Sequence, residues 1–174
     1  ANYGSVTDDA AAQSMVKTAM DTYGRVDILV NNAGILRDRS FKNMSDAEWD
    51  AVIDVHLRGA YLATKHVWAV LLEQGQGGRI IMTSSTSGLI GNFGQANYGA
   101  AKAGLAGFMR VLALEGMKYG ITVNVLAPAA LSRMTEDLMP DTPELAERMA
   151  PEKVSPTVAW LCTDEASSVT GRQF

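Results

Sequence analysis

Short apolar runs alternate with longer segments of helical periodicity along this chain. Three such runs cover residues 26–30, 79–83 and 121–126. Each is mostly apolar along its whole length and is bounded by glycine or polar residues, which is typical of strands buried on both faces of a parallel sheet. A further strand is expected to begin at residues 171–174, where the chain reads Gly-Arg-Gln-Phe.

The longer segments repeat apolar residues at helical spacing. The first predicted helix covers residues 7–23. The second begins at a capping box, Ser45-Asp46-Ala47-Glu48, and ends at the glycines of 75–78. A third covers 95–118, and a last one covers 156–163. Because strands and helices alternate, we expect an α/β fold, a doubly wound parallel sheet with helices on both faces.

Composition narrows the possible classes. The chain has 174 residues, a net charge of −4 and no basic run, which argues against a nucleic-acid partner. No apolar run reaches the ~18 residues of a membrane span, and no metal site is expected. The single cysteine, Cys162, excludes an internal disulfide and is expected to be a small core residue. Residues 132–150 are polar and methionine-rich, which predicts a mobile helical flap.

Three polar residues are the strongest candidates for chemistry. Tyr98 and Lys102 stand four residues apart on the third predicted helix, so both project from one face. A lysine ammonium beside a phenol stabilises the phenolate, so Lys102 is expected to lower the pKa of Tyr98. Ser85, thirteen residues before Tyr98, could hold a substrate oxygen next to it, with Ser84 as the competing hydroxyl.

Four ordered motifs together resemble the short-chain dehydrogenase/reductase family. They are Asn31-Asn32-Ala33-Gly34, Ser85-Thr86-Ser87-Gly88, Tyr98 with Lys102, and the turn after a strand at Pro128. Segments 35–41, 55–59 and 91–98 resemble its (3R)-hydroxyacyl-CoA dehydrogenase branch, and ketoacyl-carrier-protein reductases share part of this pattern. The resemblance covers the whole chain and implies a Rossmann-like fold and a nicotinamide-dependent oxidoreductase.

The resemblance also implies catalytic roles. Tyr98 would carry the proton, Ser85 would orient the substrate oxygen, and Lys102 would poise Tyr98 and hold the nicotinamide ribose. His56 stands where many members carry asparagine, and a buried structural histidine fits that position equally well. A Ser85–His56 pair alone would suggest a hydrolase, but no Gly-x-Ser-x-Gly elbow surrounds Ser85 and Tyr98 with Lys102 would be unexplained.

The remaining implied contacts are with the dinucleotide. They fall on Ser5, Val6, Asn32, Ala33, Gly34, Tyr98, Lys102, Ala130, Leu131 and Ser132. Gly34 would permit a close backbone approach because it has no side chain. Residues 1–6 resemble a strand that borders the adenine. After Pro128 the family commonly has glycine, where this chain has Ala129. Arg37 and Arg39 could pair with Asp38 or contact a substrate phosphate.

No glycine-rich turn that would hold the pyrophosphate precedes residue 26. In the family the strand order is 3-2-1-4-5-6-7, and the first strand neighbours the one that corresponds to 26–30. The resemblance therefore implies one partial domain over 1–174, incomplete at both ends, with an unpaired apolar edge at 26–30. Expressed within these limits, the chain is expected to be poorly soluble and inactive.

The favoured function is hydride transfer between a nicotinamide cofactor and a 3-hydroxyacyl or 3-ketoacyl thioester. The resemblance favours NAD, with NADP possible. A hydroxysteroid or an acyl-carrier-protein substrate is the nearest alternative, and a non-catalytic dehydrogenase-like fragment is the alternative of another class. We expect a homodimer or homotetramer formed through helices 46–73 and 96–118, in the cytoplasm, or in the peroxisome of a eukaryote.

Overall fold

The computed structural model describes residues 1–131 and 142–174. A three-stranded parallel sheet in the order β1-β2-β3 lies at its centre. The strands are Ile28–Asn31, Gly78–Thr83 and Ile121–Leu126. All three predicted strands are confirmed, but β1 begins two residues later than expected. The reason is that the side-chain amide of Gln74 bonds both the N–H and the carbonyl of Val26, so these groups do not join the ladder.

The end of the chain runs beside β3. The N–H of Val125 donates to the carbonyl of Arg172 (2.9 Å), and the N–H of Phe174 donates back to Val125 (3.0 Å). Val125 and Gln173 form a parallel bridge. The strand expected to begin at 171–174 therefore takes its place at this edge.

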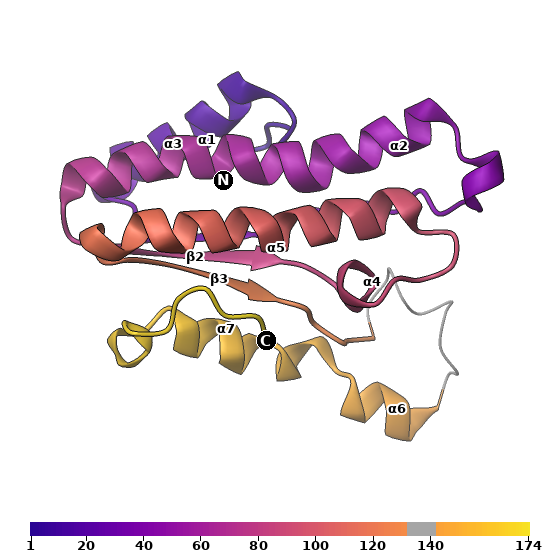
Figure 1. Ribbon diagram of the computed structural model, residues 1–174. Helices are drawn as coiled ribbons and strands as arrows, with labels where there is room; N and C mark the ends of the chain where they lie inside the picture. The colour runs from indigo at the N-terminus through magenta and orange to yellow at the C-terminus, as the bar shows by residue number, and fades with distance from the viewer. Residues whose placement is uncertain (132–141) are drawn as a thin grey trace.

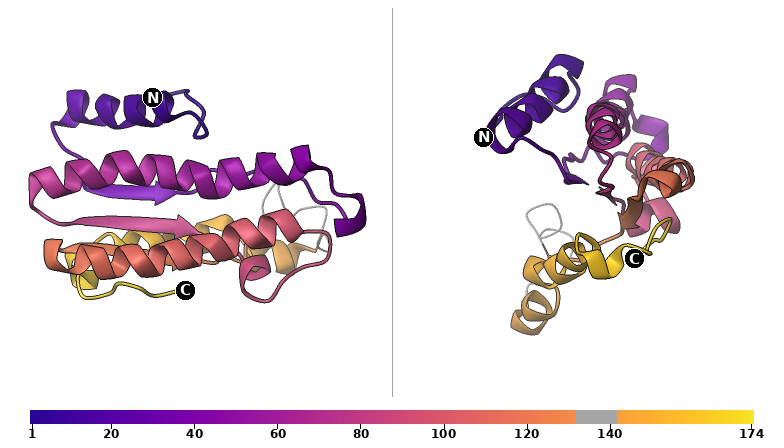
Figure 2. Two further views of the ribbon diagram at one scale, coloured as in Figure 1. Left: turned by 45° about the horizontal axis from the view of Figure 1, so that its top comes forward. Right: turned by 90° about the vertical axis from the view of Figure 1, so that its left-hand side faces the viewer.

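Helices cover both faces of the sheet, as the alternation predicted (Figure 1). The helices α1 (Asp9–Tyr23), α3 (Gly59–Gln74) and α5 (Ala96–Gly116) lie on one face, side by side in both views of Figure 2. They enclose the main core with alternate residues of the strands. The strand side chains of this core are Leu29, Ile80, Met82, Ile121, Val123 and Val125.

The opposite face is covered by the end of the chain. The helices α6 (Pro143–Arg148) and α7 (Ser155–Leu161) lie below the sheet in Figure 1. Leu161 packs against the strand residues Ile81 and Leu126, and the half-buried Cys162 lies at the edge of this smaller cluster. Burial raises the pKa of the Cys162 thiol. Cys162 is thus a packing residue, only partly enclosed.

The long helix predicted from Ser45 consists of three continuous pieces. They are α2 (Asp46–Ile53), the π-helical turn η2 (Asp54–Arg58) and α3. The capping box is present, because the Ser45 hydroxyl and the Glu48 carboxylate each accept from the other residue's backbone N–H. Sequence periodicity did not predict the π turn, in which the N–H of Gly59 donates to the carbonyl of Asp54. Such turns are rare and concentrate at functional sites.

The third predicted helix is α5, extended by a 3-10 turn, η3, at Met117–Tyr119. The loop expected over residues 84–94 contains a short helix, α4 (Thr86–Leu89). Other single turns are η1, η5 and η6, at Phe41–Asn43, Pro151–Lys153 and Asp164–Ala166.

The strand-like reading of residues 1–6 is wrong, because this segment has no strand structure. Among the described residues the sheet offers it no neighbouring strand, and it packs on helices instead. The Asn2 amide donates to Ser14 of α1 (3.1 Å), and Val6 lies against Gly59 at the start of α3. Residues 132–141 of the flap expected over 132–150 lie outside the described residues, and the described remainder contains the short helix α6 (Pro143–Arg148).

At the free edge of the sheet, β1 exposes two apolar residues. Ile28 is 46% exposed and Val30 is 41% exposed, unlike the buried residues of β2 and β3. Within the described part of the chain β1 has a neighbour on one side only. The unpaired apolar edge expected at 26–30 is therefore present. No helix among the described residues has the length and apolar character needed to span a membrane.

Candidate active site

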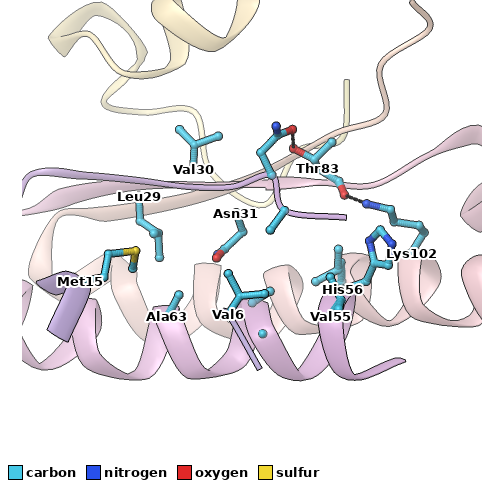
Figure 3. Close-up of a pocket in the computed structure, with 15 residues that line it drawn as sticks. Val6, Met15, Leu29, Val30, Asn31, Val55, His56, Ala63, Thr83 and Lys102 are labelled. Carbon is cyan, nitrogen blue, oxygen red and sulfur yellow. Dashed lines mark hydrogen bonds between the residues drawn. The ribbon is translucent and has the colours of Figure 1, made fainter. Parts of the chain in front are cut away.

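The candidate residues gather where β1 and β2 end, beneath the junction of η2 and α5. Figure 3 shows His56 and Lys102 side by side here, with Lys102 directed toward the end of β2 at Thr83. A small cavity of about 70 Å³ opens beside them. Its polar lining includes Asn31, Asn32, His56, Thr83 and Lys102.

Tyr98 and Lys102 project from one face of α5, as their spacing predicted. The Lys102 ammonium lies 5.3 Å from the centre of the Tyr98 ring and donates to the carbonyl of Thr83. Lys102 is only 3% exposed. Burial lowers the pKa of Lys102 to about 8, since a charged ammonium is less stable away from water.

The direction expected for the pKa of Tyr98 is not the one found. Burial of the phenol raises the pKa of Tyr98, and the negative charge of Asp38 raises it further. The hydroxyl of Ser85 opposes these effects through a hydrogen bond to the phenol, which lowers the pKa. Spacing reveals that Lys102 is near, but it does not reveal how much water the phenol loses, and here desolvation dominates.

Ser85 is held by its position at the start of a short helix. It is the N-cap of α4, where its hydroxyl accepts from the N–H of Ser87 (3.2 Å). The neighbouring Ser84 is occupied elsewhere, because its buried hydroxyl donates to the carbonyl of Lys102 (2.9 Å). Of the two competing hydroxyls, the structure therefore places that of Ser85 beside Tyr98.

A glycine allows the Ser85 loop to approach α5 closely. A Cβ on Gly88 would lie 2.7 Å from backbone and side-chain carbons of Lys102. Any larger residue would push the loop away from the helix that carries Tyr98. The spacing between the serine motif and the tyrosine motif thus reflects direct backbone packing.

His56 lies inside the π turn and is 3% exposed. Its Nε2 is 3.0 Å from the backbone nitrogen of Ile35 and 2.8 Å from the Ile35 oxygen, so it accepts or donates according to tautomer. The ring meets Tyr98 edge to face at 5.1 Å, and Nδ1 has no partner among the described residues. Burial, together with the charge of Lys102, lowers the pKa of His56 to about 4. Because Nε2 bonds the Ile35 backbone, the described contacts give no Ser85–His56 pair of the hydrolase kind.

The turn after β1 has the form expected for a ligand-facing backbone. Asn32, Ala33 and Gly34 are all exposed, and the Asn32 carboxamide accepts from the Thr83 hydroxyl (3.0 Å). A Cβ on Gly34 would lie 2.5 Å from Cε1 of His56. Gly34 is therefore required at least partly by the histidine itself, a reason that the sequence could not supply.

The other expected dinucleotide contacts are less uniform. Val6 lines the cavity, while the Ser5 hydroxyl bonds Thr7 (2.9 Å). The N–H of Leu131 donates to the carbonyl of Met149 (2.7 Å). Ala130 is half-buried in the segment after Pro128. Ser132 lies outside the described residues.

Sequence reasoning missed two buried polar residues at the start of α5. The Asn97 amide donates to the carbonyls of Arg37 and Glu48 (3.0 Å each), and its oxygen accepts from the N–H of Tyr98 (2.7 Å). Gln95 donates to the carboxylate of Asp38 (2.7 Å). The sequence feature that could have identified Gln95 and Asn97 is their position just before Tyr98.

The arginines of the same loop do not pair with Asp38 as proposed. The Arg39 guanidinium lies 3.3 Å from Glu48, and Arg37 donates to the carbonyl of Leu36 (2.7 Å). In the described parts of the chain, no three histidine, cysteine or acidic side chains gather as metal ligands would.

Comparison with known proteins agrees with this geometry. A sequence profile of the short chain dehydrogenase family matches residues 3–143. A short-chain type dehydrogenase/reductase of Mycobacterium tuberculosis is 52% identical over 96% of this chain and 57% of its own length. Peroxisomal multifunctional enzyme type 2 of Mus musculus is 52% identical over 98% of this chain and 22% of its own length. A 3-oxoacyl-[acyl-carrier-protein] reductase of Synechocystis is 44% identical over 92% of this chain and 67% of its own length.

A solved structure gives the same result. The crystal structure of a short chain dehydrogenase from Mycobacterium avium matches with a TM-score of 0.86 and 48% identity, over 97% of this chain and 58% of that one. The chain thus spans about half the length of the first of these relatives and of this structure. Members of the family use nicotinamide dinucleotides. With most of its length matched by the family profile, the chain belongs to the short chain dehydrogenase family.

Proposed function

We propose that the protein is an oxidoreductase that transfers a hydride between a nicotinamide dinucleotide and a (3R)-hydroxyacyl thioester or its 3-keto partner. The observation that carries this proposal is the convergence of Ser85, Tyr98 and Lys102, of which Lys102 also lines the cavity at the turn after β1. A purely structural role needs none of these three groups in this arrangement, which argues against a non-catalytic fragment.

In the oxidation direction, the Tyr98 phenolate takes the proton of the substrate hydroxyl. Ser85 donates a hydrogen bond to the same oxygen and holds it near the phenol. The Lys102 ammonium, 5.3 Å from the ring centre, stabilises the negative charge on Tyr98 electrostatically. In the reduction direction Tyr98 returns the proton to the developing alkoxide.

The residues around the cavity fit a dinucleotide. The exposed residues Asn32, Ala33 and Gly34 leave room for a close ligand. The ammonium of Lys102, which projects from α5 to the end of β2, can reach ribose hydroxyls. When bound, the nicotinamide supplies the hydride acceptor. We favour NAD over NADP on the resemblance of segments 35–41, 55–59 and 91–98 to the hydroxyacyl-CoA branch.

The substrate class rests on two kinds of support. The same three segments resemble the (3R)-hydroxyacyl-CoA dehydrogenase branch. A relative with 44% identity is, by its name, a reductase of 3-oxoacyl groups on a carrier protein. That relative favours a second candidate, a ketoacyl-carrier-protein reductase, in which the acyl group is the same and the carrier differs.

Turnover by the full-length protein tests both candidates. Purified protein is assayed at 340 nm with NAD⁺ and NADP⁺ against the R and S forms of a 3-hydroxyacyl-CoA, and in reverse against a 3-ketoacyl carrier protein. We expect oxidation of the R thioester with NAD⁺. Preference for the carrier protein would select the second candidate. Tight dinucleotide binding without turnover of any substrate would contradict both.

We propose further that two copies associate through the outer faces of α3 and α5. Apolar side chains are exposed on this surface, and a shared groove joins the two helices at one end. The exposed apolar side chains are Tyr61, Leu72, Val111, Leu114, Met117 and Tyr119. Exposed apolar clusters of this kind mark protein interfaces. The result would be a homodimer or homotetramer, located in the peroxisome if the source is eukaryotic and otherwise in the cytoplasm.

A further inference from the structure

A buried amide joins the loops that follow β1 and β2. Gln95, the residue before α5, is 6% exposed. Its NH₂ group donates to the Asp38 carboxylate (2.7 Å), and its oxygen accepts from the hydroxyl of Ser87 (2.6 Å) and the amide of Asn92 (3.3 Å). Both the NH₂ group and the oxygen of this side chain are therefore hydrogen-bonded.

The backbone reinforces the same junction. The N–H of Arg39 donates to the carbonyl of Gly94 (2.8 Å), and Arg39 and Gln95 form a parallel bridge. Two residues further on, Asn97 fixes the carbonyl of Arg37 (3.0 Å). The segment that carries Asp38 is thus attached to the first turn of α5 on both sides of that residue.

This junction lies next to the proposed proton carrier. Tyr98 follows Gln95 by three residues, and Ser87 is two residues from Ser85. Asp38 itself is exposed and has no arginine partner in the described residues. The hydrogen bond from Gln95 therefore restricts the position of the exposed Asp38 carboxylate.

We propose that Gln95 is a positioning residue that holds the Asp38 carboxylate near Tyr98, and that this negative charge raises the pH at which Tyr98 ionises. This inference rests on the proposed function. The titratable groups that face Tyr98 in the described structure are Lys102 from α5, His56 from η2 and Asp38 from the loop after β1. Asp38 is the only carboxylate among them, and its negative charge disfavours the phenolate.

The direction of the effect follows from charge. Removing the carboxylate in Asp38→Asn makes the phenolate easier to form, so the alkaline rise of the oxidation rate moves to lower pH by a few tenths of a pH unit. Gln95→Met releases the carboxylate toward solvent and moves the rise in the same direction by a smaller amount. Because both changes act through one charge, the double variant should match Asp38→Asn alone.

The experiment measures pH profiles of oxidation for the full-length protein and these three variants. Asp164→Asn is the matched control, because it removes one exposed carboxylate near Arg79, where β2 begins, and should leave the profile unchanged. An active Asp38→Asn variant with an unmoved profile overturns the proposal. Additive shifts in the double variant overturn the role of Gln95.

A second readout does not depend on turnover. In protein labelled with ¹³C at the tyrosine Cζ, the Tyr98 signal is assigned by its loss in Tyr98→Phe and is titrated directly. A downward shift of its midpoint in Asp38→Asn supports the inference even where the proposed substrate is wrong, and an unchanged midpoint refutes it. Because Asp38 is exposed, Asp38→Asn is expected to fold. It therefore still tests the effect of the Asp38 charge on Tyr98 if Gln95→Met does not fold.

Discussion

The two ends of α5 contrast in what they bury and what they expose. Near its beginning, the polar residues Asn97 and Lys102 are almost fully buried. Near its end, the apolar residues Val111 and Leu114 are 53% and 67% exposed. A helix formed only to cover a sheet would show the reverse, with polar residues outside and apolar residues inside.

Both the buried polar residues and the exposed apolar residues have a physical requirement. A buried polar group is tolerated only when it is hydrogen-bonded, and Asn97 uses both its amide NH₂ and its oxygen while Lys102 donates to Thr83. An exposed apolar cluster is unfavourable in water unless another surface covers it. The contrast teaches that one helix serves the proposed chemistry at its start and the proposed assembly at its end.

The largest expected effect is at the buried end. Tyr98→Phe removes only the oxygen proposed to carry the proton and keeps the ring packed against His56. We expect turnover to fall by ~10³ or more, which corresponds to roughly 4 kcal/mol of barrier. Steady-state kinetics of the full-length protein with NAD⁺ and the R hydroxyacyl thioester measures the loss.

The other end of the helix supplies a matched control. Tyr119 also has a lysine over its ring, with Lys118 4.7 Å from the centre. Tyr119→Phe makes the same chemical change and should leave turnover nearly unaltered. If Tyr98→Phe were as active as Tyr119→Phe, the proton carrier would have to be sought at Ser85 or His56.

Lys102→Met is expected to have the next largest effect. It removes the charge proposed to stabilise the phenolate and the proposed contact to the ribose, so turnover should fall by ~10² and dinucleotide affinity should weaken as well. Fluorescence titration with NADH separates the binding loss from the kinetic loss. Lys118→Met is the control, and equal behaviour of the two variants would remove Lys102 from the mechanism.

At the exposed end, Leu114→Glu tests the interface. A charge placed in the centre of an apolar contact should weaken association by about 100-fold, measured by sedimentation or light scattering. Tyr23→Glu places the same charge on an exposed aromatic residue of α1, away from the α3–α5 surface, and should leave association unchanged. A full-length protein that is monomeric before any substitution contradicts the proposed interface.

The sequence was most informative where the determinants are local. The spacing of Tyr98 and Lys102, the capping box at Ser45 and the apolar runs all lie within a few residues, and each was found in its predicted element. The sequence did not predict that β1 begins two residues later than its apolar run. The cause is Gln74, 48 residues away, which bonds the backbone of Val26.

The same reasoning explains what was missed in the site. The bond from Gln95 to Asp38 joins residues 57 apart in the chain, and no periodicity encodes it. The direction of the Tyr98 pKa depends on lost hydration, which a motif does not report. The steric need for Gly34 arises from the His56 ring, 22 residues later.

The smallest expected effect concerns His56 and is one of stability. Its pKa is about 4 in the folded chain and 6.5 for an ordinary histidine. Between these values the unfolded state takes up a proton that the folded state does not, so stability falls as pH decreases from 6.5 toward 4. The total decline from this group is at most about 3–4 kcal/mol.

His56→Asn removes the titrating ring from the π turn, so the decline between pH 7.5 and pH 5 should become shallower than in the unchanged protein. Urea unfolding of the full-length protein at pH 7.5, 6.0 and 5.0 measures the difference. His66→Asn, at a histidine that bonds Asp9 on the helix surface, should leave the decline in place. Parallel curves for His56→Asn and the unchanged protein would mean that His56 gains a proton in the folded state as readily as in the unfolded state. The buried, neutral character assigned to the ring beside Lys102 would then be wrong.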